Sequence, residues 1–326
     1  MIRRRLGLTG VLVSIVVTSG GCNVIQYQRN RIRGRLARAG LHETQVRLGD
    51  DTMSYWDGGS GSPVLLLHGM GMAGLWQWNE QASSLASTHR VIIPDLLWFG
   101  SSSSSRRDFS LGHQVAAVRA LIDHLGLARL DLVGLSYGGF VAYGVAILDH
   151  TRVRSLILVD SPGPAFGEDD YTRLMARLGT KDPAEIFIPG TPDAVDKLMA
   201  LAYQHPPYIP RFAARQLIAE AYTEHRDELL ALFKASSEHI DELTATAPRI
   251  TQPLCVIWGR NDPVFPVALS DRLLQLATNR SIRHVVEDAR HTPNLEYPKE
   301  FDGLLRSCLA FGGEPPPDGP QSHEDR

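Results

Sequence analysis

The stretch Leu130-Asp131-Leu132-Val133-Gly134-Leu135-Ser136-Tyr137-Gly138-Gly139 decides the fold of this chain of 326 residues. Its first four residues form a mostly apolar run that fits a short buried strand, and a helical pattern follows as far as Leu148. Between them, Gly134 to Gly138 match G-x-S-x-G, which predicts a sharp turn between a strand and a helix. Glycines flank the serine because its strained backbone leaves no room for neighbouring β-carbons.

This turn makes Ser136 the candidate nucleophile. The turn would lift the hydroxyl clear of the chain and aim the backbone N–H of Tyr137 at whatever bonds to it. The N-terminus of the following helix adds a partial positive charge. The alternative is an ordinary glycine-rich turn, because a lone G-x-S-x-G also arises by chance. The strand before it and the helix after it favour the nucleophile.

Buried strands and helices alternate along the chain, which predicts an α/β fold with a mostly parallel central sheet and helices on both faces. The expected core comprises residues 43–163 and 249–311. Residues 164–248 lack convincing strands, carry helical patterns and are punctuated by prolines, so they are predicted to form a helical cap insertion. The tail, 312–326, has no apolar content to fold with and is expected to be disordered.

Two further residues complete a candidate catalytic set with Ser136. A serine at its free pKa is a poor nucleophile and needs a base, which in turn needs an orienting acid. Asp262 follows a predicted strand at 254–258, and His291 follows another at 282–286. Sites in such sheets gather at the carboxyl ends of strands, and the expected chain order is serine, acid, histidine. Taken alone, Asp262 also fits an ordinary turn; together the three residues predict a triad.

These motifs resemble those of the α/β-hydrolase superfamily over about residues 50–311. The most specific parts are His68-Gly69-Met70-Gly71, the turn around Ser136, Gly259-Arg260-Asn261-Asp262 and His291. The cap and the His-Gly-x-Gly turn look most like the group that holds monoacylglycerol lipases, small carboxylesterases and carbon–carbon bond hydrolases.

The resemblance implies a role for each matched residue. Ser136 would be the nucleophile, His291 the general acid and base, and Asp262 the acid that orients the histidine. The backbone N–H groups of Met70 and Tyr137 would form the oxyanion hole. His68 would brace that turn rather than take part in the chemistry. A serine at position 136 also argues against the dehalogenases and epoxide hydrolases of this fold, which use an aspartate nucleophile.

One loop departs from the family pattern. The family often shows Pro-Asp-Leu-Pro-Gly-Phe-Gly-x-Ser, where this chain has Leu97 and Trp98 in place of the Pro-Gly pair. We therefore expect this loop to line the pocket differently. Trp98, Phe166 and Tyr203 are candidate pocket residues that could bury an acyl chain; the alternative is that such aromatic residues form the core of the cap.

The N-terminus is typical of an export signal. Residues 1–5 carry a positive charge, residues 6–17 are mostly apolar, and Ser19-Gly20-Gly21-Cys22 follows. The ending resembles the lipobox of bacterial lipoproteins, which implies lipidation of Cys22, although that family prefers Leu or Val where this chain has Ser19. Residues 1–21 are thus predicted to be a signal peptide or a membrane anchor, with an uncleaved anchor and simple secretion as alternatives to lipidation. The expected location is the bacterial cell envelope, attached to a membrane and facing the periplasm.

Charge is unevenly distributed in the chain. Residues 1–40 carry eight arginines and no acid, whereas the whole chain has a net charge of -3. Residues 22–42 are therefore predicted to be a basic spacer beside the membrane, either attracted to anionic headgroups or simply solvated. Export would keep this segment away from nucleic acid, so no nucleic-acid partner is expected.

The cysteines predict neither a disulfide framework nor a metal site. There are three, at positions 22, 255 and 308, an odd number without metal-ligand spacing. Cys255 and Cys308 lie in apolar runs and are interpreted as small buried hydrophobic residues. No metal or organic cofactor is implied.

The triad and the predicted membrane tether favour a hydrolase that acts on carboxylic esters, with acylglycerols or other medium-chain lipid esters as substrates. A carbon–carbon bond hydrolase of the ring-cleavage type shares the same triad and remains the first alternative. A non-catalytic, membrane-tethered binding protein is the second, and the presence of all three triad residue types argues against it.

Overall fold

The computed structural model describes residues 23–180, 182–238 and 248–313, and its centre is a mixed sheet of nine strands. The strand order is β1-β2-β4-β3-β6-β7-β8-β9, with β5 paired to β2. β1 and β2 form an antiparallel hairpin, β2 pairs antiparallel with β4, and the remaining pairs from β4 to β9 are parallel. The strands are β1 Leu41–Leu48, β2 Asp51–Gly59, β3 Ser62–Leu67, β4 His89–Pro94, β5 Ser103–Ser104, β6 Leu130–Leu135, β7 Val153–Val159, β8 Leu254–Gly259 and β9 Ser281–Val286.

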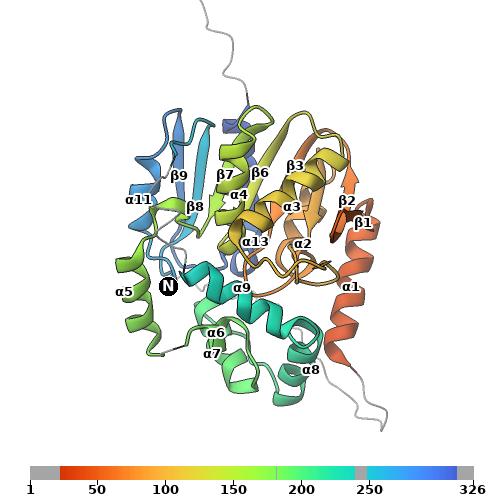
Figure 1. Cartoon of the computed structure of the whole chain (residues 1–326), viewed down its shortest axis with the longest axis vertical. Coiled ribbons are helices and arrows are strands. Elements are labelled where there is room, and N and C mark those ends of the chain that lie inside the picture. Colours follow the sequence, from red (N-terminus) through yellow and green to blue (C-terminus); the bar gives the residue numbers. More distant parts are fainter. Residues whose placement is uncertain (1–22, 181, 239–247, 314–326) are drawn as a thin grey trace, which may run out of the picture.

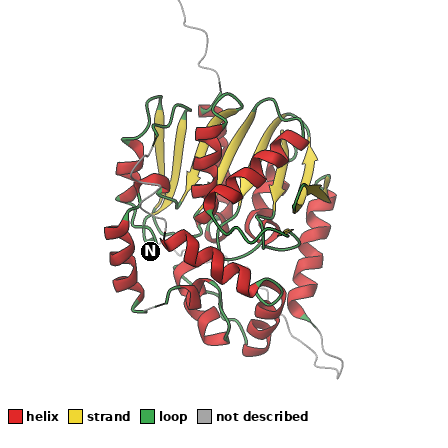
Figure 2. Ribbon diagram, in the orientation of Figure 1, coloured by secondary structure: helices red, strands yellow, loops and turns green. Residues whose placement is uncertain are grey.

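Helices cover both faces of this sheet, as Figures 1 and 2 show. One face packs on α3 (Leu111–His124), α4 (Tyr137–Leu148) and α11 (Leu269–Leu274). The other face packs on α2 (Gly74–Leu85) and α13 (Pro298–Phe311). The predicted α/β-hydrolase fold, with a mostly parallel sheet between helices, is confirmed.

The apolar runs of the inner strands explain this arrangement. Alternate side chains of a strand point to opposite faces of the sheet. In β3, Leu65 and Leu67 accordingly join the core on one face, whereas Val64 and Leu66 join the core on the other. A strand that is buried on both faces is apolar along most of its length. This is why β3 and its neighbours appear in the sequence as nearly uninterrupted apolar runs.

The expected cap contains only helices in its described part, and it lies at the end of the sheet shown at the bottom of Figure 2. Many of its apolar side chains join one of the two sheet cores, whereas Val195, Ala214 and Leu217 form a small cluster of their own. The rings of Phe187 and Phe233 stack at 5.6 Å. Lys181 and residues 239–247 lie outside the described part of the chain. The elements are the 3-10 turn η1 Gly163–Ala165, α5 Glu168–Leu178, α6 Ala184–Phe187, α7 Pro192–Ala202, α8 Arg211–Ala221 and α9 Arg226–Glu238.

The basic segment at 22–42 differs from the predicted spacer. Residues Val24–Arg38 form helix α1, which lies against α2 and α8, and β1 begins at Leu41. Leu36 is fully buried in one of the two sheet cores. Three arginines of α1 bind acidic side chains of the body, in the pairs Arg29–Glu220, Arg33–Glu43 and Arg35–Glu80. Residues 24–38 therefore form a docked helix and not a solvated spacer, because acids of the folded body pair with three of its five arginines; the expected place beside a membrane stays a prediction.

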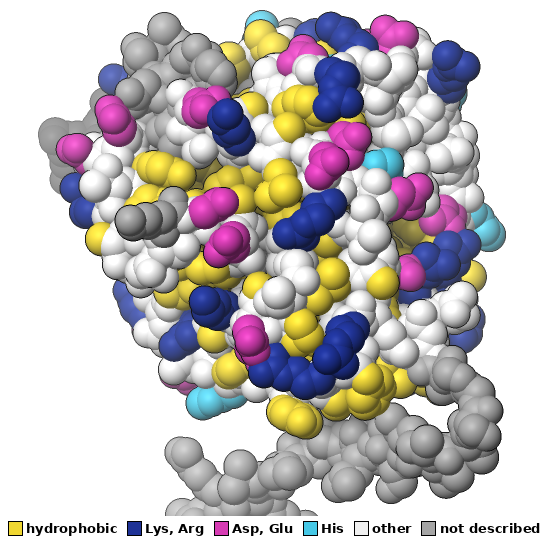
Figure 3. All heavy atoms as spheres, turned by 60° about the horizontal axis from the view of Figure 1, so that its bottom comes forward, with side chains coloured by type: hydrophobic (Ala, Val, Ile, Leu, Met, Phe, Trp, Pro, Cys, Tyr) yellow, Lys and Arg dark blue, Asp and Glu magenta, His cyan; other side chains and the backbone are white. Residues whose placement is uncertain are grey.

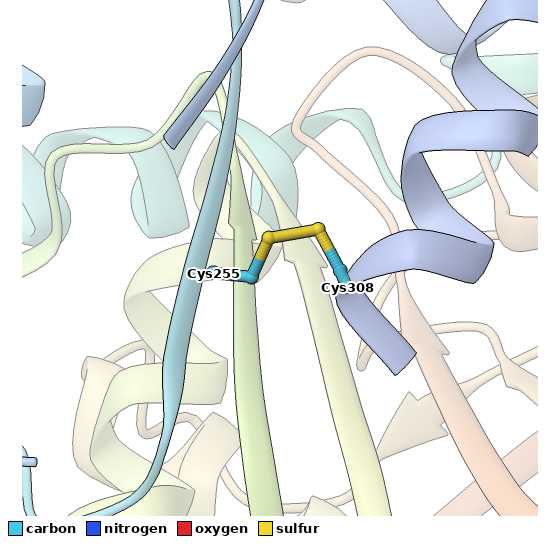
Figure 4. The surroundings of a disulfide bond; sticks show 2 residues. All are labelled: Cys255 and Cys308. Carbon is cyan, nitrogen blue, oxygen red and sulfur yellow. A yellow bond between two sulfur atoms is a disulfide. The ribbon is translucent and has the colours of Figure 1, made fainter. Parts of the chain in front are cut away.

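A disulfide bond joins Cys255 on β8 to Cys308 on α13, 53 residues apart in the sequence (Figure 4). The interpretation of these two cysteines as buried is confirmed, but their interpretation as unpaired residues is wrong. Cys255 points to the face of the sheet on which α13 packs, and this packing brings the two Cα atoms to 5.6 Å. That distance is within the range of natural disulfides. Cysteine spacing in the sequence carries no sign of this approach.

The predicted signal peptide or anchor, 1–21, and the predicted lipidation site, Cys22, lie outside the described residues, as does the tail from 314 onward. Gly312 and Gly313 directly follow α13. Among the described helices, none has the length and apolar content that crossing a bilayer requires. At the cap end of the molecule, apolar side chains are interspersed with basic and acidic ones (Figure 3).

Candidate active site

Ser136 occupies the turn between β6 and α4 with a left-handed backbone, φ 52° and ψ −121°. Its neighbours must be glycines because the chain passes too close to itself for side chains. A β-carbon on Gly134 would lie 2.3 Å from the backbone oxygen of Gly138, and one on Gly138 would lie 2.4 Å from the backbone oxygen of His68. The fold therefore maintains a strained serine, a feature that is concentrated at functional sites.

The structure brings the three predicted triad residues together although they are far apart in the sequence. The Oγ of Ser136 lies 2.8 Å from Nε2 of His291, and Nδ1 of the same ring lies 2.9 Å from Oδ2 of Asp262. The residues are 8 %, 7 % and 5 % exposed, respectively. This is the geometry of a nucleophile, a base and an orienting acid.

Loops at the carboxyl ends of two neighbouring strands hold the acid and the base. Asp262 follows β8, and its Oδ1 accepts the backbone N–H groups of Val264 and Phe265 at 2.8 and 3.1 Å. Asp262 therefore keeps Oδ2 for the imidazole. His291 follows β9, and its backbone N–H donates to the carbonyl of Leu201 on the cap helix α7 at 3.4 Å.

The predicted oxyanion donors lie on either side of the serine. Tyr137 is the first residue of α4, so its N–H has no acceptor within the helix. Met70 belongs to the turn after β3, and within the described part of the chain its N–H makes no backbone–backbone hydrogen bond. A β-carbon on Gly69 would lie 3.1 Å from that of Ser136, so the turn passes directly beside the nucleophile.

His68 braces this turn, as the sequence predicts. Its Nδ1 donates to the carbonyl of Gly69 at 2.8 Å, and its Nε2 accepts the N–H of Leu96 at 2.9 Å. Burial lowers the pKa of His68 to about 4, so the ring is neutral near pH 7 and can both donate and accept.

Asp95, at the end of β4, links the same turn to the loop after that strand. Its Oδ1 accepts the N–H of Gly74 at 2.9 Å, and a backbone hydrogen bond from Ser101 also reaches its carboxyl. Burial raises the pKa of Asp95 to about 7, with these two hydrogen bonds opposing the shift.

The three predicted pocket residues occupy different environments. Phe166 lies one ring away from the triad: it contacts Phe265, which contacts the imidazole of His291 at a centroid distance of 5.6 Å. Trp98 is buried with a left-handed backbone, φ 69°, and packs on the rings of Phe109 and His113.

Tyr203 ends α7, and burial raises the pKa of its hydroxyl to about 12. Tyr203 directly follows Leu201 and Ala202, whose carbonyls accept hydrogen bonds from the N–H groups of His291 and Thr292. The lining role of all three aromatic residues stays a prediction.

The cap closes over the site through hydrogen bonds. Thr292, next to the candidate base, donates from both its N–H and its hydroxyl to the carbonyl of Ala202. The hydroxyl of Tyr222, at the end of α8, donates to the carbonyl of Gly71 beside the predicted oxyanion turn. The cap therefore contacts the histidine loop and the turn after β3, the two loops that lie on either side of Ser136.

A separate hollow of about 420 Å³ lies at the amino ends of β3 and β6, lined by Ser62, Pro63, Arg129, Leu130 and Arg154. In a parallel pair of strands this is the opposite edge of the sheet from Ser136. The hollow therefore plays no part in the triad.

Sequence reasoning did not select one residue that adjoins the triad. Asp160 directly follows β7 and is completely buried, and its carboxyl lies within 4.8 Å of the Asp262 carboxylate and the His291 ring. The signal was present, because Asp160 ends a buried strand just as Asp262 and His291 do. Only the packing of β7 beside β8 shows that these residues meet.

The family model of the alpha/beta hydrolase fold matches residues 62–298. The chain belongs to this family. The matched range includes the turn of Ser136 and the loops of Asp262 and His291. The protein is accordingly a hydrolase of this fold.

Its relatives include enzymes of more than one activity. A 2-hydroxy-6-oxo-2,4-heptadienoate hydrolase from Pseudomonas putida is 27 % identical over 85 % of this chain and 96 % of its own length. Lipase 1 from Psychrobacter immobilis is 26 % identical over 84 % of this chain and 83 % of its own length. Among solved structures, a putative lipase from Acinetobacter baumannii is 25 % identical, with a TM-score of 0.73 over 90 % of this chain and 99 % of that one. A bacterial membrane phospholipase A, 24 % identical, has the same fold with a TM-score of 0.73 over 89 % of this chain and 92 % of that one.

Proposed function

We propose that this hydrolase cleaves carboxylic esters through a covalent acyl-enzyme, with acylglycerols or other medium-chain lipid esters as substrates. The observation that supports it most is the continuous hydrogen-bonded chain from Ser136 through His291 to Asp262. In the first step, Oγ of Ser136 attacks the ester carbonyl while Nε2 of His291 takes the hydroxyl proton. Asp262 holds the ring in the tautomer that leaves Nε2 free to accept.

The same residues complete the reaction. The N–H groups of Met70 and Tyr137 bind the oxyanion, and removing one such donor typically lowers turnover about 10²–10³-fold. His291 then gives its proton to the leaving alkoxide. Water attacks the acyl-enzyme with His291 as base, which releases the carboxylic acid and restores Ser136.

Apolar packing around the site favours an acyl substrate. Cap and core side chains form one apolar cluster that includes Met70, Tyr137, Phe187, Leu229 and Leu232. An acyl chain that displaces water from such surroundings gains about 0.8 kcal/mol for each buried CH₂ group.

Three arginines of the cap and of the histidine loop donate hydrogen bonds to neutral groups. Arg177 and Arg226 donate to backbone carbonyls, and Arg290 binds the carbonyl of Ala200 and the side chain of Gln204. A diketo-acid substrate carries a carboxylate that a cation would bind. Donation to neutral groups leaves the charges of these arginines uncompensated, so the contacts do not distinguish a neutral ester from such an acid.

Carbon–carbon bond cleavage is the second candidate, and the names of several relatives favour it. Three of them are a 2-hydroxy-6-oxo-2,4-heptadienoate hydrolase and two 2-hydroxymuconate semialdehyde hydrolases, 27 to 29 % identical to this chain. The triad suits either reaction, so the choice depends on the pocket that binds the substrate.

We also infer that the protein is exported and attached to a membrane through its N-terminus, by a lipid on Cys22 or by an uncleaved anchor. The charged start, the apolar stretch and the small residues before Cys22 support this. The disulfide between Cys255 and Cys308 supports an oxidising compartment, because such bonds are rare in the cytosol. Attachment would hold the enzyme beside acyl lipids.

The first experiment measures hydrolysis of p-nitrophenyl esters over a series of acyl lengths by the full-length protein, with Ser136→Ala as the matched control. We expect serine-dependent activity with a maximum at medium chains. Activity on 2-hydroxy-6-oxo-2,4-heptadienoate together with inertness toward every ester would favour carbon–carbon cleavage. Inertness of the folded protein toward both classes would favour a binding role.

The attachment is tested by fractionating cells that express the wild type or Cys22→Ala. Lipidation predicts that the variant moves from the membrane to the soluble fraction. Unchanged membrane association would contradict lipidation and favour an uncleaved anchor.

A further inference from the structure

A second buried carboxyl touches the candidate triad. Asp160 follows β7 with a left-handed backbone, φ 43°, and its backbone N–H donates to the carbonyl of Ile257 on β8 at 3.0 Å. Its Oδ1 accepts the N–H of Gly259 at 2.8 Å. The other oxygen, Oδ2, is buried and finds no hydrogen-bond partner among the described residues.

The carboxyl of Asp160 lies beside the Asp262 carboxylate. These two carboxyls and the imidazole of His291 place one oxygen or nitrogen atom each within 4.8 Å of one another. All three side chains are buried. Two carboxylates so close together in a buried site repel each other, which favours the neutral form of one of them.

The hydrogen bonds decide which member of the pair keeps the proton. Asp262 accepts from two backbone N–H groups and from Nδ1 of His291, all of which stabilise its charge. Asp160 accepts only the N–H of Gly259. Burial, followed by the neighbouring charge of Asp262, raises the pKa of Asp160 well above its usual range. Asp262 is therefore the ionised member and Asp160 the neutral one.

We propose that Asp160 is a positioning residue for the triad: a neutral carboxylic acid that donates a hydrogen bond to Asp262 and so fixes that carboxylate against His291. The proposal rests on the proposed role of the triad. A proton on Oδ2 turns this unsatisfied buried acceptor into a donor, and Asp262 is the acceptor that the proposal assigns to it. It also explains why a carboxyl is tolerated at a completely buried position.

Among the described residues, His291 and Arg177 are the other ionisable groups that act on the Asp160–Asp262 pair. His291 faces Asp262 from the loop after β9. Arg177 on α5 reaches the loop of Asp262, donating to the carbonyls of Pro263 and Val264, and it interacts electrostatically with Asp262. Neither of them supplies a hydrogen bond to Asp160 among the described contacts, so Asp160 depends on Asp262 and Gly259.

Two substitutions separate donation from mere packing. Asp160→Asn keeps a donor toward Asp262, an acceptor for Gly259 and a residue type that tolerates this backbone. Asp160→Gly removes the donor and also tolerates the backbone. We expect the asparagine variant to retain kcat within about threefold, and the glycine variant to lose about 10- to 100-fold in kcat with little change in KM, the usual effect of one buried hydrogen bond to a charged group.

The pH profile of kcat/KM gives a readout that packing alone would not move. With the donor absent, Asp262 carries a less dispersed charge and stabilises the protonated imidazole more. The acid limb should therefore shift to higher pH in Asp160→Gly and stay in place in Asp160→Asn. If Asp160 were ionised instead, Asp160→Asn would remove a negative charge and shift the acid limb to lower pH, which would overturn the proposal. A glycine variant with the wild-type kcat and profile would overturn it as well.

Two measurements do not depend on the substrate. The rate at which a fluorophosphonate labels Ser136 reports the activated serine whatever ester or ketone the enzyme uses, and it should follow the same order: wild type, asparagine, glycine. Infrared difference spectra of wild type against Asp160→Asn at pH 7 should show the carbonyl band of a protonated, buried carboxylic acid. Absence of this band would refute a neutral Asp160 even if the glycine variant failed to fold or the proposed substrate class were wrong.

Discussion

Reducing the disulfide between Cys255 and Cys308 should destabilise the protein by a predictable amount. The bond closes a loop of 53 residues. In the chain-entropy model, a loop of this length restricts the unfolded chain enough to stabilise the folded state by about 4 kcal/mol. Both cysteines are buried, and reduction removes no heavy atom, so the volume that fills this part of the core is retained. The loss should therefore come almost entirely from the unfolded state.

Urea unfolding followed by tryptophan fluorescence measures this difference. With a slope of about 3 kcal/mol per molar urea, a loss of about 4 kcal/mol lowers the midpoint by about 1.3 M. All proteins carry Cys22→Ala, so that no third thiol can exchange with the bond. The Cys255→Ala/Cys308→Ala variant is the control, and its midpoint should not respond to reductant. Coincident midpoints for the oxidised and reduced forms would refute the reasoning.

Three further predictions concern α1, the buried acid of the β4 loop and the serine turn. Leu36→Ala should lower the free energy of unfolding by about 2–5 kcal/mol, whereas Arg35→Ala, which removes an exposed ion pair, should lower it by less than about 1 kcal/mol; equal small effects in urea titrations would contradict a docked α1. Because the pKa of Asp95 is about 7 in the folded state and near 4 unfolded, folding takes up a proton between these values. The contribution of Asp95 to stability therefore falls as the pH rises from 4 to 7. The Tm of Asp95→Asn minus that of wild type should increase over this range and stay constant above pH 7. A Tm difference that is the same at every pH would rule this out. Gly138→Ala should abolish ester hydrolysis, because its β-carbon would lie 2.4 Å from the backbone oxygen of His68; normal activity would show that the turn can shift.

Local sequence determined the strands, the serine turn and the order of the site. An apolar run must be buried, and a run that is apolar at every position must be buried on both faces, so the inner strands could be predicted without a structure. The turn at Ser136 needs glycines for steric reasons that involve only its neighbours and the adjacent turn. Asp262 and His291 could be selected because parallel strands place their carboxyl ends at one edge.

Only the tertiary structure decided the features that depend on contacts between distant segments. The pairing of Cys255 with Cys308 requires α13 to lie on one face of β8. The docking of α1 requires acids at positions 80 and 220 to meet its arginines, and a basic run gives no hint of where such acids lie.

The same holds for Asp160, which becomes significant only because β7 pairs with β8 and brings two carboxyls together. Sequence determines what each segment needs, such as burial, a turn or a counter-charge. The packed fold determines which distant segment meets that need, because close approach in space is set by the sum of all contacts and not by any one stretch of chain.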